Sequence, residues 1–172
     1  MITPSFAAAA VLAASPFVDA AALQARNATV CAPVHLLLAR GTTEGYPGTL
    51  GSLADLVIDA VPGADYENII YPATDETSTE SYFEGRQAVA QQLSAYAGSC
   101  PESKIVFLAY SQKYPRTSTQ SAILETLYSH KIHDYCNNGD PVCASGDNIQ
   151  AHLEYPQNWD TDAAAWLKSM VQ

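Results

Sequence analysis

Three side chains that could carry out nucleophilic chemistry occur along the chain in the order Ser111, Asp140 and His152. A serine hydroxyl is a poor nucleophile until a histidine takes its proton. An aspartate can fix the tautomer of that histidine and stabilise the imidazolium that forms. The hypothesis is that these three residues act together. Because their order and spacing often arise by chance, it depends on the elements that position them.

Ser111 directly follows an apolar, β-rich run, Ile105–Tyr110, which predicts a buried strand. A serine on a strand-to-helix turn is held in a strained elbow with its hydroxyl above the sheet, usually in the pattern Gly-x-Ser-x-Gly. This chain has Ala109 and Lys113 in the glycine positions. The lysine is the serious departure, because its side chain must fit where bare backbone normally passes. The alternative is a serine that only forms a turn or caps a helix.

Thr42 follows Gly41 just after another apolar run, Val34–Ala39. A hydroxyl residue after a glycine can offer its O–H and its backbone N–H to a developing oxyanion. The backbone N–H of Gln112, next to the serine, would be the second donor. The alternative is an ordinary strand-to-helix loop in which glycine and threonine form the turn.

The four cysteines predict two disulfides. Cys136 and Cys143 flank a glycine-containing turn that would fix Asp140, and this pairing leaves Cys31 for Cys100. The latter two precede strand-like runs, whose starts would lie about 5 Å apart if the strands are parallel neighbours. Metal binding is the alternative, but the chain has no paired C-x-x-C spacing. Two disulfides agree with export from the cell.

Strand and helix patterns alternate along the chain, which predicts a mostly parallel sheet covered by helices on both faces. The expected fold class is therefore α/β, a three-layer sandwich. Ligands bind such sheets beyond the carboxyl ends of the strands, and the order serine, acid, histidine is that of α/β hydrolases. The expected strands are Val34–Ala39, Asn68–Tyr71, Ile105–Tyr110 and a weaker one at Lys131–Tyr135. The expected helices begin near Ser52, Thr77, Thr117 and Asp160.

Composition bounds the partners. The 172 residues suit one domain, and 48% hydrophobic against 15% charged residues allow a real core. The formal charge of −10 disfavours nucleic acid and membranes as partners and suits a neutral ester or polysaccharide. We expect a monomer, no cofactor and no metal. His130, His133 and Asp134 lack a fourth ligand, and His35 suits a hydrogen-bonded core histidine.

Residues 1–20 suit a secretory signal peptide, with an apolar run at Phe6–Ala14 before Val18-Asp19-Ala20. The segment lacks lysine and arginine, and a buried first helix is the alternative. The run is too short to span a bilayer. Residues 21–172 would then form the mature domain, with Asn27 in a glycosylation sequon.

Together these segments resemble the fungal cutinase and acetylxylan esterase family. The resemblance covers most of the chain after Cys31 and is carried by Arg40-Gly41-Thr42-Thr43-Glu44, Tyr110-Ser111-Gln112, Cys136–Cys143 and His152. It implies a secreted carboxylesterase with a small doubly wound sheet, no cofactor and a shallow, exposed site. Ser111 would be the nucleophile, Asp140 the acid and His152 the base. Thr42 and Gln112 would form the oxyanion hole, and the disulfides would be Cys31–Cys100 and Cys136–Cys143.

The chain departs from the family between nucleophile and acid. Asp140 follows Ser111 by only 29 positions, which is several tens fewer than the resemblance implies, so one parallel strand is expected to be missing. The last expected strand, Lys131–Tyr135, could then pair with the strand before Ser111, which would displace Asp140 and His152 by about 4.8 Å. Compensating loops, a gap in the sheet and an inactive chain are the three alternatives. A misjudged exon boundary or a degraded gene copy would explain such a cut.

The expected substrate is acetylated xylan, with cutin second. The stretch from Tyr66 to Tyr82 resembles the acetylxylan esterase branch, and few apolar loop residues lie near Thr42 or His152 in the sequence. The competing function is a catalytically inactive secreted homologue that keeps a carbohydrate-binding role.

Overall fold

The computed structural model describes residues 30–75, 80–111 and 118–172. The expected signal peptide, Asn27, Gln112 and Lys113 lie outside these residues, as do the expected helix caps Thr77 and Thr117. Residues 31–172 form one compact unit. Within the described residues, no helix combines the length and apolar character that crossing a bilayer requires.

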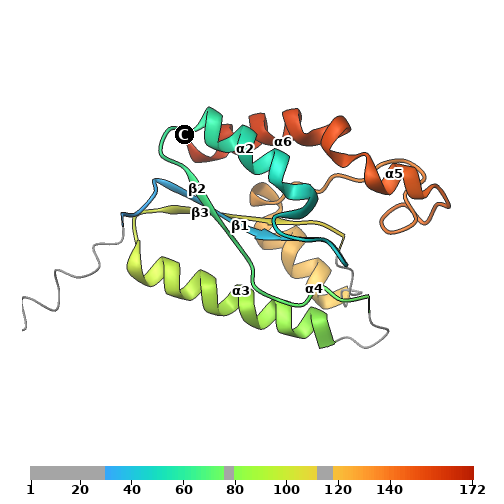
Figure 1. Ribbon diagram of the computed structural model, residues 1–172, viewed down its shortest axis with the longest axis horizontal. Coiled ribbons are helices and arrows are strands. Elements are labelled where there is room, and N and C mark those ends of the chain that lie inside the picture. The colour runs from blue at the N-terminus through green and yellow to red at the C-terminus, as the bar shows by residue number, and fades with distance from the viewer. Residues whose placement is uncertain (1–29, 76–79, 112–117) are drawn as a thin grey trace, which may run out of the picture. The chain divides into compact units, whose positions relative to one another are not determined.

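The described part of the sheet has three parallel strands in the order β2-β1-β3 (Figure 1). The central strand β1 (Val34–Ala39) pairs with β2 (Asp65–Asn68) on one edge and with β3 (Lys104–Ala109) on the other. Its sequence VHLLLA has no alternation, because both faces are covered and five of its six residues are buried. The predicted parallel three-layer class is confirmed.

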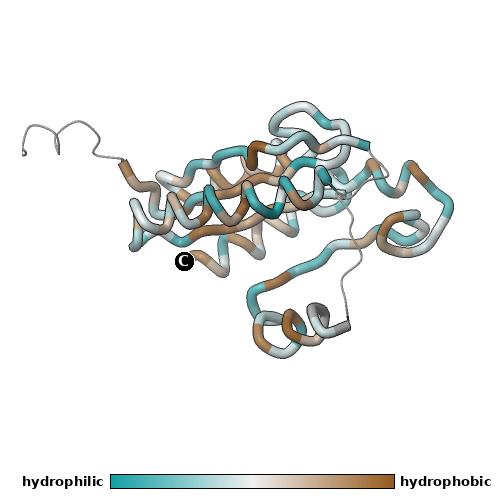
Figure 2. Tube along the Cα trace, turned by 90° about the horizontal axis from the view of Figure 1, so that it is seen from below, coloured by the Kyte–Doolittle hydropathy of each residue, from teal (hydrophilic) through white to brown (hydrophobic). Residues whose placement is uncertain are grey.

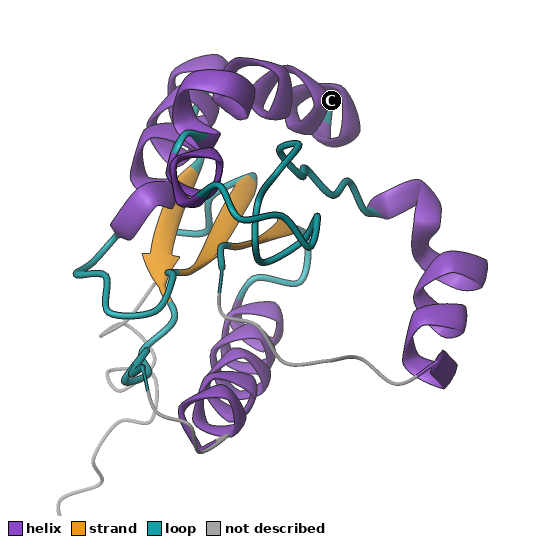
Figure 3. Ribbon diagram, turned by 90° about the vertical axis from the view of Figure 1, so that its right-hand side faces the viewer, coloured by secondary structure: helices purple, strands orange, loops and turns teal. Residues whose placement is uncertain are grey.

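Two helices cover one face of the sheet and one helix covers the other (Figures 1 and 3). Leu36 and Leu38 of β1 pack under α2 (Gly51–Ala60) and α6 (Tyr155–Val171). Leu37, one position along, packs on the opposite face against α3 (Glu80–Ser99). The alternating direction of strand side chains therefore divides the core into two layers. Apolar residues are concentrated between the helices and the sheet (Figure 2).

Two predicted strands are wrong. The second strand is Asp65–Asn68 rather than Asn68–Tyr71. Ile69 and Tyr71 are buried as their apolar character suggests, but the hydrogen-bonded ladder with β1 uses the polar residues before them. Lys131–Tyr135 is not a strand. Three short helical turns, α4 (Ser118–Ile123), η2 (Leu124–Tyr128) and η3 (Ser129–Lys131), end at Lys131, and Ile132–Tyr135 is irregular.

The last helix also begins earlier than predicted, at Tyr155 instead of Asp160. Pro156 lies in its first turn, where a missing N–H and a fixed φ are favourable. Asp160 instead accepts a hydrogen bond from Ser52 Oγ at 2.5 Å, and this bond links α6 to α2. Two additional short helices are η1 (Gly48–Leu50) and α5 (Ile149–Leu153).

Both expected disulfides are present. Cys31 and Cys100 lie just before β1 and β3, with their Cα atoms 5.5 Å apart, as expected for the starts of neighbouring parallel strands. This bond fixes the amino ends of the two strands whose carboxyl ends lead into the loop with Thr42 and into Ser111.

The α3 face of the sheet is only partly covered. Phe107 of β3 is 50% exposed, and Phe83 and Leu93 of α3 are 45% and 39% exposed. A groove of about 440 Å³ runs between α3 and the sheet, lined by Ala39, Tyr71, Phe107 and Ala109 among others. The segment Ser118–Lys131 lies apart from α3 and the strands in Figures 2 and 3, and its Ile123, Leu127 and Tyr128 are also exposed.

This uneven cover gives a stability test on one pair of neighbours, Leu37 and Phe107, which face each other across β1 and β3. Leu37→Ala should lower the free energy of unfolding by about 2–5 kcal/mol, because Leu37 is fully buried. Phe107→Ala should cost less than about 2 kcal/mol, because half of the side chain already contacts water. Urea unfolding of the oxidised protein measures both, and equal losses would contradict an open α3 face.

Candidate active site

Ser111 lies immediately beyond β3 with φ at +61°. This left-handed conformation is costly for a residue with a side chain, and serines on strand-to-helix elbows adopt strained backbone of this kind. The preceding residue is still held to the sheet, since Tyr110 N–H donates to the carbonyl of Ala39 at 3.1 Å. The serine is therefore turned sharply away from a strand whose last residue is fixed.

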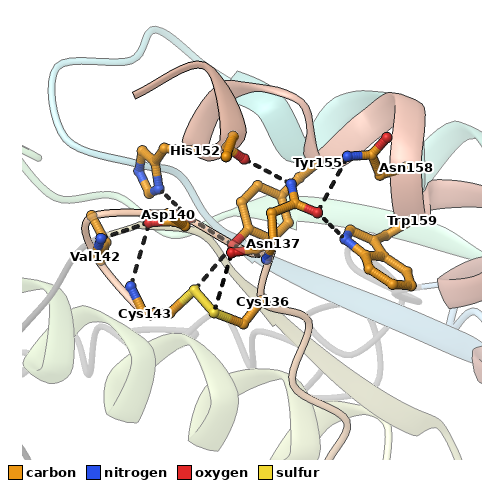
Figure 4. The surroundings of a disulfide bond; sticks show 10 residues. Cys136, Asn137, Asp140, Val142, Cys143, His152, Tyr155, Asn158 and Trp159 are labelled. Carbon is orange, nitrogen blue, oxygen red and sulfur yellow. Dashed lines mark hydrogen bonds and ion pairs between the residues drawn. A yellow bond between two sulfur atoms is a disulfide. The ribbon is translucent and has the colours of Figure 1, made fainter. Parts of the chain in front are cut away.

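Asp140 lies in the turn that the Cys136–Cys143 disulfide closes, and its side chain has no solvent exposure (Figure 4). Its Oδ1 accepts a hydrogen bond from Val142 N–H at 2.6 Å and one from Cys143 N–H at 3.4 Å. Its Oδ2 accepts one from the hydroxyl of Tyr155 at 2.7 Å. A buried carboxylate needs such donors in place of water.

The turn continues into α5, which carries His152. Asn148 caps this helix through its side chain, which accepts from the N–H groups of Gln150 and Ala151. Gly146 lets its backbone lie close to that of Gly139, because a Cβ at position 146 would lie 2.1 Å from the carbonyl oxygen of Gly139. Asp140 and His152 thus come from one short, internally bonded segment.

The three side chains meet although they come from distant parts of the chain. His152 Nδ1 lies 2.8 Å from Asp140 Oδ2, and His152 Nε2 lies 2.6 Å from Ser111 Oγ. Both distances are in the range of good hydrogen bonds. The displacement expected from the short segment between Ser111 and Asp140 does not occur, and no fourth strand is needed among the described residues to bring the groups together.

Asp140 is held as a carboxylate. Burial would raise its pKa, but the hydrogen bonds from Tyr155, His152 and Val142 outweigh burial and lower the pKa to about 2. An ionised Asp140 can only accept hydrogen bonds, so the proton of neutral His152 lies on Nδ1. Nε2 then faces Ser111 with its lone pair, which is the orientation a general base requires.

The loop after β1 is fixed by a buried arginine and a glutamate. Arg40 donates to the carbonyls of Glu44, Tyr71 and Pro72 at 2.6–2.9 Å, and its guanidinium lies 3.9 Å from the centre of the Tyr46 ring. The Glu44 carboxylate accepts from Gly41 N–H at 2.7 Å and from Thr49 N–H at 3.1 Å. These contacts hold the backbone on both sides of Thr42, which is partly exposed. Gln112 lies outside the described residues, so the expected oxyanion pair is placed only in part.

The sequence did not point to two aromatic residues at the site. Tyr110 stacks on the ring of His152, with 5.3 Å between centroids, and its hydroxyl donates to the carbonyl of His152. Tyr155 contacts Asp140 as described above. A tyrosine directly before the serine and another three residues after the histidine were the available signals.

Other candidate ligands have structural surroundings. His133 stacks on Tyr135 and meets the ring of Trp166 edge to face. His35 stacks on Tyr96 at 3.5 Å, and its Nδ1 lies 2.6 Å from Asp65 Oδ1. Its Nε2 is buried without a hydrogen bond to any described residue and lies 3.6 Å from Glu67 Oε1. Nowhere in the described ranges do three His, Cys, Asp or Glu side chains gather closely enough to hold a metal ion.

A strand that ends in a strained serine, within a parallel sheet covered by helices on both faces, is typical of the α/β hydrolase class. The family model described as Cutinase matches residues 30–115 and 113–171. Cutinase 11 of Verticillium dahliae is 35% identical over 228 residues, which cover 95% of this chain and 76% of that protein. Acetylxylan esterase of Hypocrea jecorina is 24% identical over 206 residues, covering 82% of this chain and 68% of the relative. The chain therefore belongs to the cutinase family.

Solved structures agree with this assignment. An acetylxylan esterase structure at 0.90 Å resolution superposes with a TM-score of 0.69 at 25% identity, covering 83% of this chain and all of that chain. A Trichoderma reesei cutinase with a phosphonate inhibitor gives a TM-score of 0.61 at 24% identity, covering 83% and 78%. The latter shows the shared fold alone.

The lowered pKa of Asp140 makes a prediction about stability and pH. The pKa rises from about 2 in the folded protein to about 3.8 on unfolding, so the charged form stabilises the fold by about 2 kcal/mol above pH 4. This stabilisation should be lost as the pH falls from about 4 to about 2. Urea unfolding at pH 5 and at pH 2.5 measures the loss, and Asp140→Asn is the reference that lacks it. An identical pH dependence in the two proteins would contradict the assignment.

Proposed function

We propose that this protein hydrolyses carboxylic esters through an acyl-enzyme formed on Ser111. The observation that carries the proposal is the continuous chain of hydrogen bonds from Asp140 through His152 to Ser111 Oγ, at 2.8 and 2.6 Å. Membership of a family whose members are named cutinases and acetylxylan esterases supports the same chemistry.

In the first half of the reaction, His152 Nε2 removes the proton of Ser111 as Oγ attacks the ester carbonyl carbon. The tetrahedral intermediate places negative charge on the former carbonyl oxygen, which Thr42 and the backbone N–H of Gln112 would stabilise. The imidazolium then gives its proton to the leaving alcohol, and the acyl group remains on Ser111. Asp140 stays ionised throughout and stabilises the imidazolium.

In the second half, water takes the place of the alcohol. His152 removes a proton from the water as its oxygen attacks the acyl carbon, and the same donors stabilise the second intermediate. Collapse of this intermediate returns the proton to Ser111 Oγ and releases the carboxylic acid. No cofactor enters this cycle.

Acetylated xylan is the proposed first substrate. The relatives named acetylxylan esterase support it, and the acetylxylan esterase structure gives the higher TM-score of the two compared above. The two disulfides support secretion, since such bonds persist in oxidising compartments. We therefore propose a secreted monomer that acts on esters of plant cell walls.

A second candidate, an ester with a longer apolar acyl or alcohol part such as cutin, is favoured by one observation. Ile149 and Leu153 flank His152 on α5 and are 61% and 56% exposed. Apolar side chains beside the base can contact an apolar substrate, although few such residues were expected near His152.

The proposed nucleophile can be tested by substitution. Ser111→Ala should abolish the burst of p-nitrophenol from p-nitrophenyl acetate and lower kcat at least about 10³-fold, because no acyl-enzyme can form. Ser145→Ala is the matched control, since Ser145 is exposed and also has a left-handed φ of +54°. A folded, oxidised wild-type protein without a burst would favour the inactive homologue instead.

The role of the exposed apolar residues of α5 can be tested by comparing esters with long and short acyl chains. Ile149→Ser should lower kcat/KM for p-nitrophenyl octanoate about fivefold and leave the acetate ester nearly unchanged, because about 1 kcal/mol of apolar contact is lost. Ile70→Ser is the control, because Ile70 is 66% exposed and its backbone N–H donates to Gln92 of α3. Equal effects on both esters would remove the support for an apolar substrate.

A further inference from the structure

Tyr155 occupies a special place next to the triad. It is the first residue of α6 and lies three positions after His152. Its hydroxyl donates to Asp140 Oδ2 at 2.7 Å and accepts from Asn137 N–H at 3.2 Å (Figure 4). Asp140 Oδ2 is the same oxygen that His152 Nδ1 contacts.

The direction of these bonds is settled by chemistry. The Asn137 N–H can only donate, so the phenol accepts there. Its own proton goes to Asp140 Oδ2 at 2.7 Å, because a carboxylate is a much stronger acceptor than the disulfide sulfur of Cys143, which lies 3.3 Å from the hydroxyl. Burial, together with the hydrogen bond to Asp140, raises the pKa of Tyr155. The phenol therefore remains a donor over the pH range in which an esterase works.

The position of Asn137 is itself fixed. Its Nδ2 donates to the carbonyl of Ala151 at 2.7 Å, and its Oδ1 accepts from Trp159 Nε1 at 2.7 Å and from Asn158 Nδ2 at 3.2 Å. Asn137 thus joins the stapled turn, α5 and α6, and its backbone N–H presents a fixed donor to the Tyr155 hydroxyl. The phenol is clamped between this donor and Asp140.

The Tyr155 ring adds a second constraint. It meets the rings of His152 and Tyr110 edge to face, with centroid separations of 6.1 and 5.7 Å. This packing alone would explain an aromatic residue here, and phenylalanine would serve as well. The hydroxyl is the part that packing does not explain, and it points at a carboxylate with no exposure to water.

We propose that Tyr155 is a positioning residue for the reaction, whose hydroxyl holds the Asp140 carboxylate in the orientation that contacts Nδ1 of His152. The proposal rests on the proposed esterase function. Among the causes that lower the pKa of Asp140 against the effect of burial, the Tyr155 hydrogen bond is the largest. Without it, Oδ2 would keep only the donor of His152 at a position with no exposure to water.

The test is Tyr155→Phe, which keeps the ring and removes only the hydroxyl. We expect kcat for p-nitrophenyl acetate to fall about tenfold or more, as for other residues that orient a catalytic group, with KM within about twofold. We also expect the pKa of Asp140, followed by carboxyl ¹³C NMR, to rise clearly above 2. The matched control is Tyr66→Phe, because Tyr66 is 37% exposed on β2 and its hydroxyl has no hydrogen bond among the described residues.

A double-mutant cycle separates positioning from packing. In the Asp140→Asn background, Tyr155→Phe should cause little further loss of kcat, because the group through which it acts has gone. A full additional loss there, or an unchanged Asp140 pKa and kcat in the single variant, would overturn the proposal. If Tyr155→Phe does not fold, a fluorinated tyrosine at position 155 should lose activity with increasing pH as its more acidic hydroxyl ionises, and an unchanged pH profile would overturn the proposal.

The two proposals fail in different ways. A wild-type protein without esterase activity would refute the proposed function. The Asp140 titration needs no substrate and can be made in the Ser111→Ala background. If the wild-type protein shows a normal burst and Tyr155→Phe changes neither kcat nor the pKa of Asp140, only the role of Tyr155 is refuted.

Discussion

The active-site end of the molecule depends on a buried carboxylate. Asp140 has no exposure to water, so an unpaired charge there would be very costly. The segment from Cys136 to Trp159 supplies what water would have supplied: backbone N–H groups on one oxygen, and the donors of His152 and Tyr155 on the other. The disulfide, the Asn148 cap and the Asn137 network all hold those donors in place. The contacts that fold this segment therefore also orient His152.

Because this segment is held together by its own contacts, the hydrogen bonds of the site form despite the short connection between Ser111 and Asp140. Asp140 and His152 belong to one segment that leads into α6, and α6 packs on the same face of the sheet as α2. Their position relative to Ser111 is consequently set by α6 and by the Tyr110 contact, rather than by a strand beside β3. The match to the family model divides at residues 113–115, just after Ser111, which supports the interpretation that the chain is shortened there.

The sequence allowed prediction of the features that depend on short-range pattern. The apolar runs placed β1 and β3, and their parallel pairing made the Cys31–Cys100 bond geometrically reasonable. The fourth strand was wrong because Lys131–Tyr135 has a strand-like composition, yet a strand exists only where a neighbour supplies a ladder of hydrogen bonds. β2 was shifted for a similar reason, since burial of Ile69 and Tyr71 does not require pairing. Tyr155 was missed because its partner depends on how the turn folds back onto α6.

The two faces of the sheet differ in how completely helices cover them. On the α2 and α6 face, Leu108 of β3 is buried and Tyr110 contacts the base, so this face carries both core and site. On the α3 face, the uncharged run Ile105–Ala109 has the composition of an interior strand, but Phe107 remains half exposed and a groove stays open. Apolar cover is therefore incomplete on the α3 face. The hydrogen bonds of Ser111, His152 and Asp140 lie on the side that α2 and α6 cover, so the open α3 face leaves these three side chains within hydrogen-bond distance of one another.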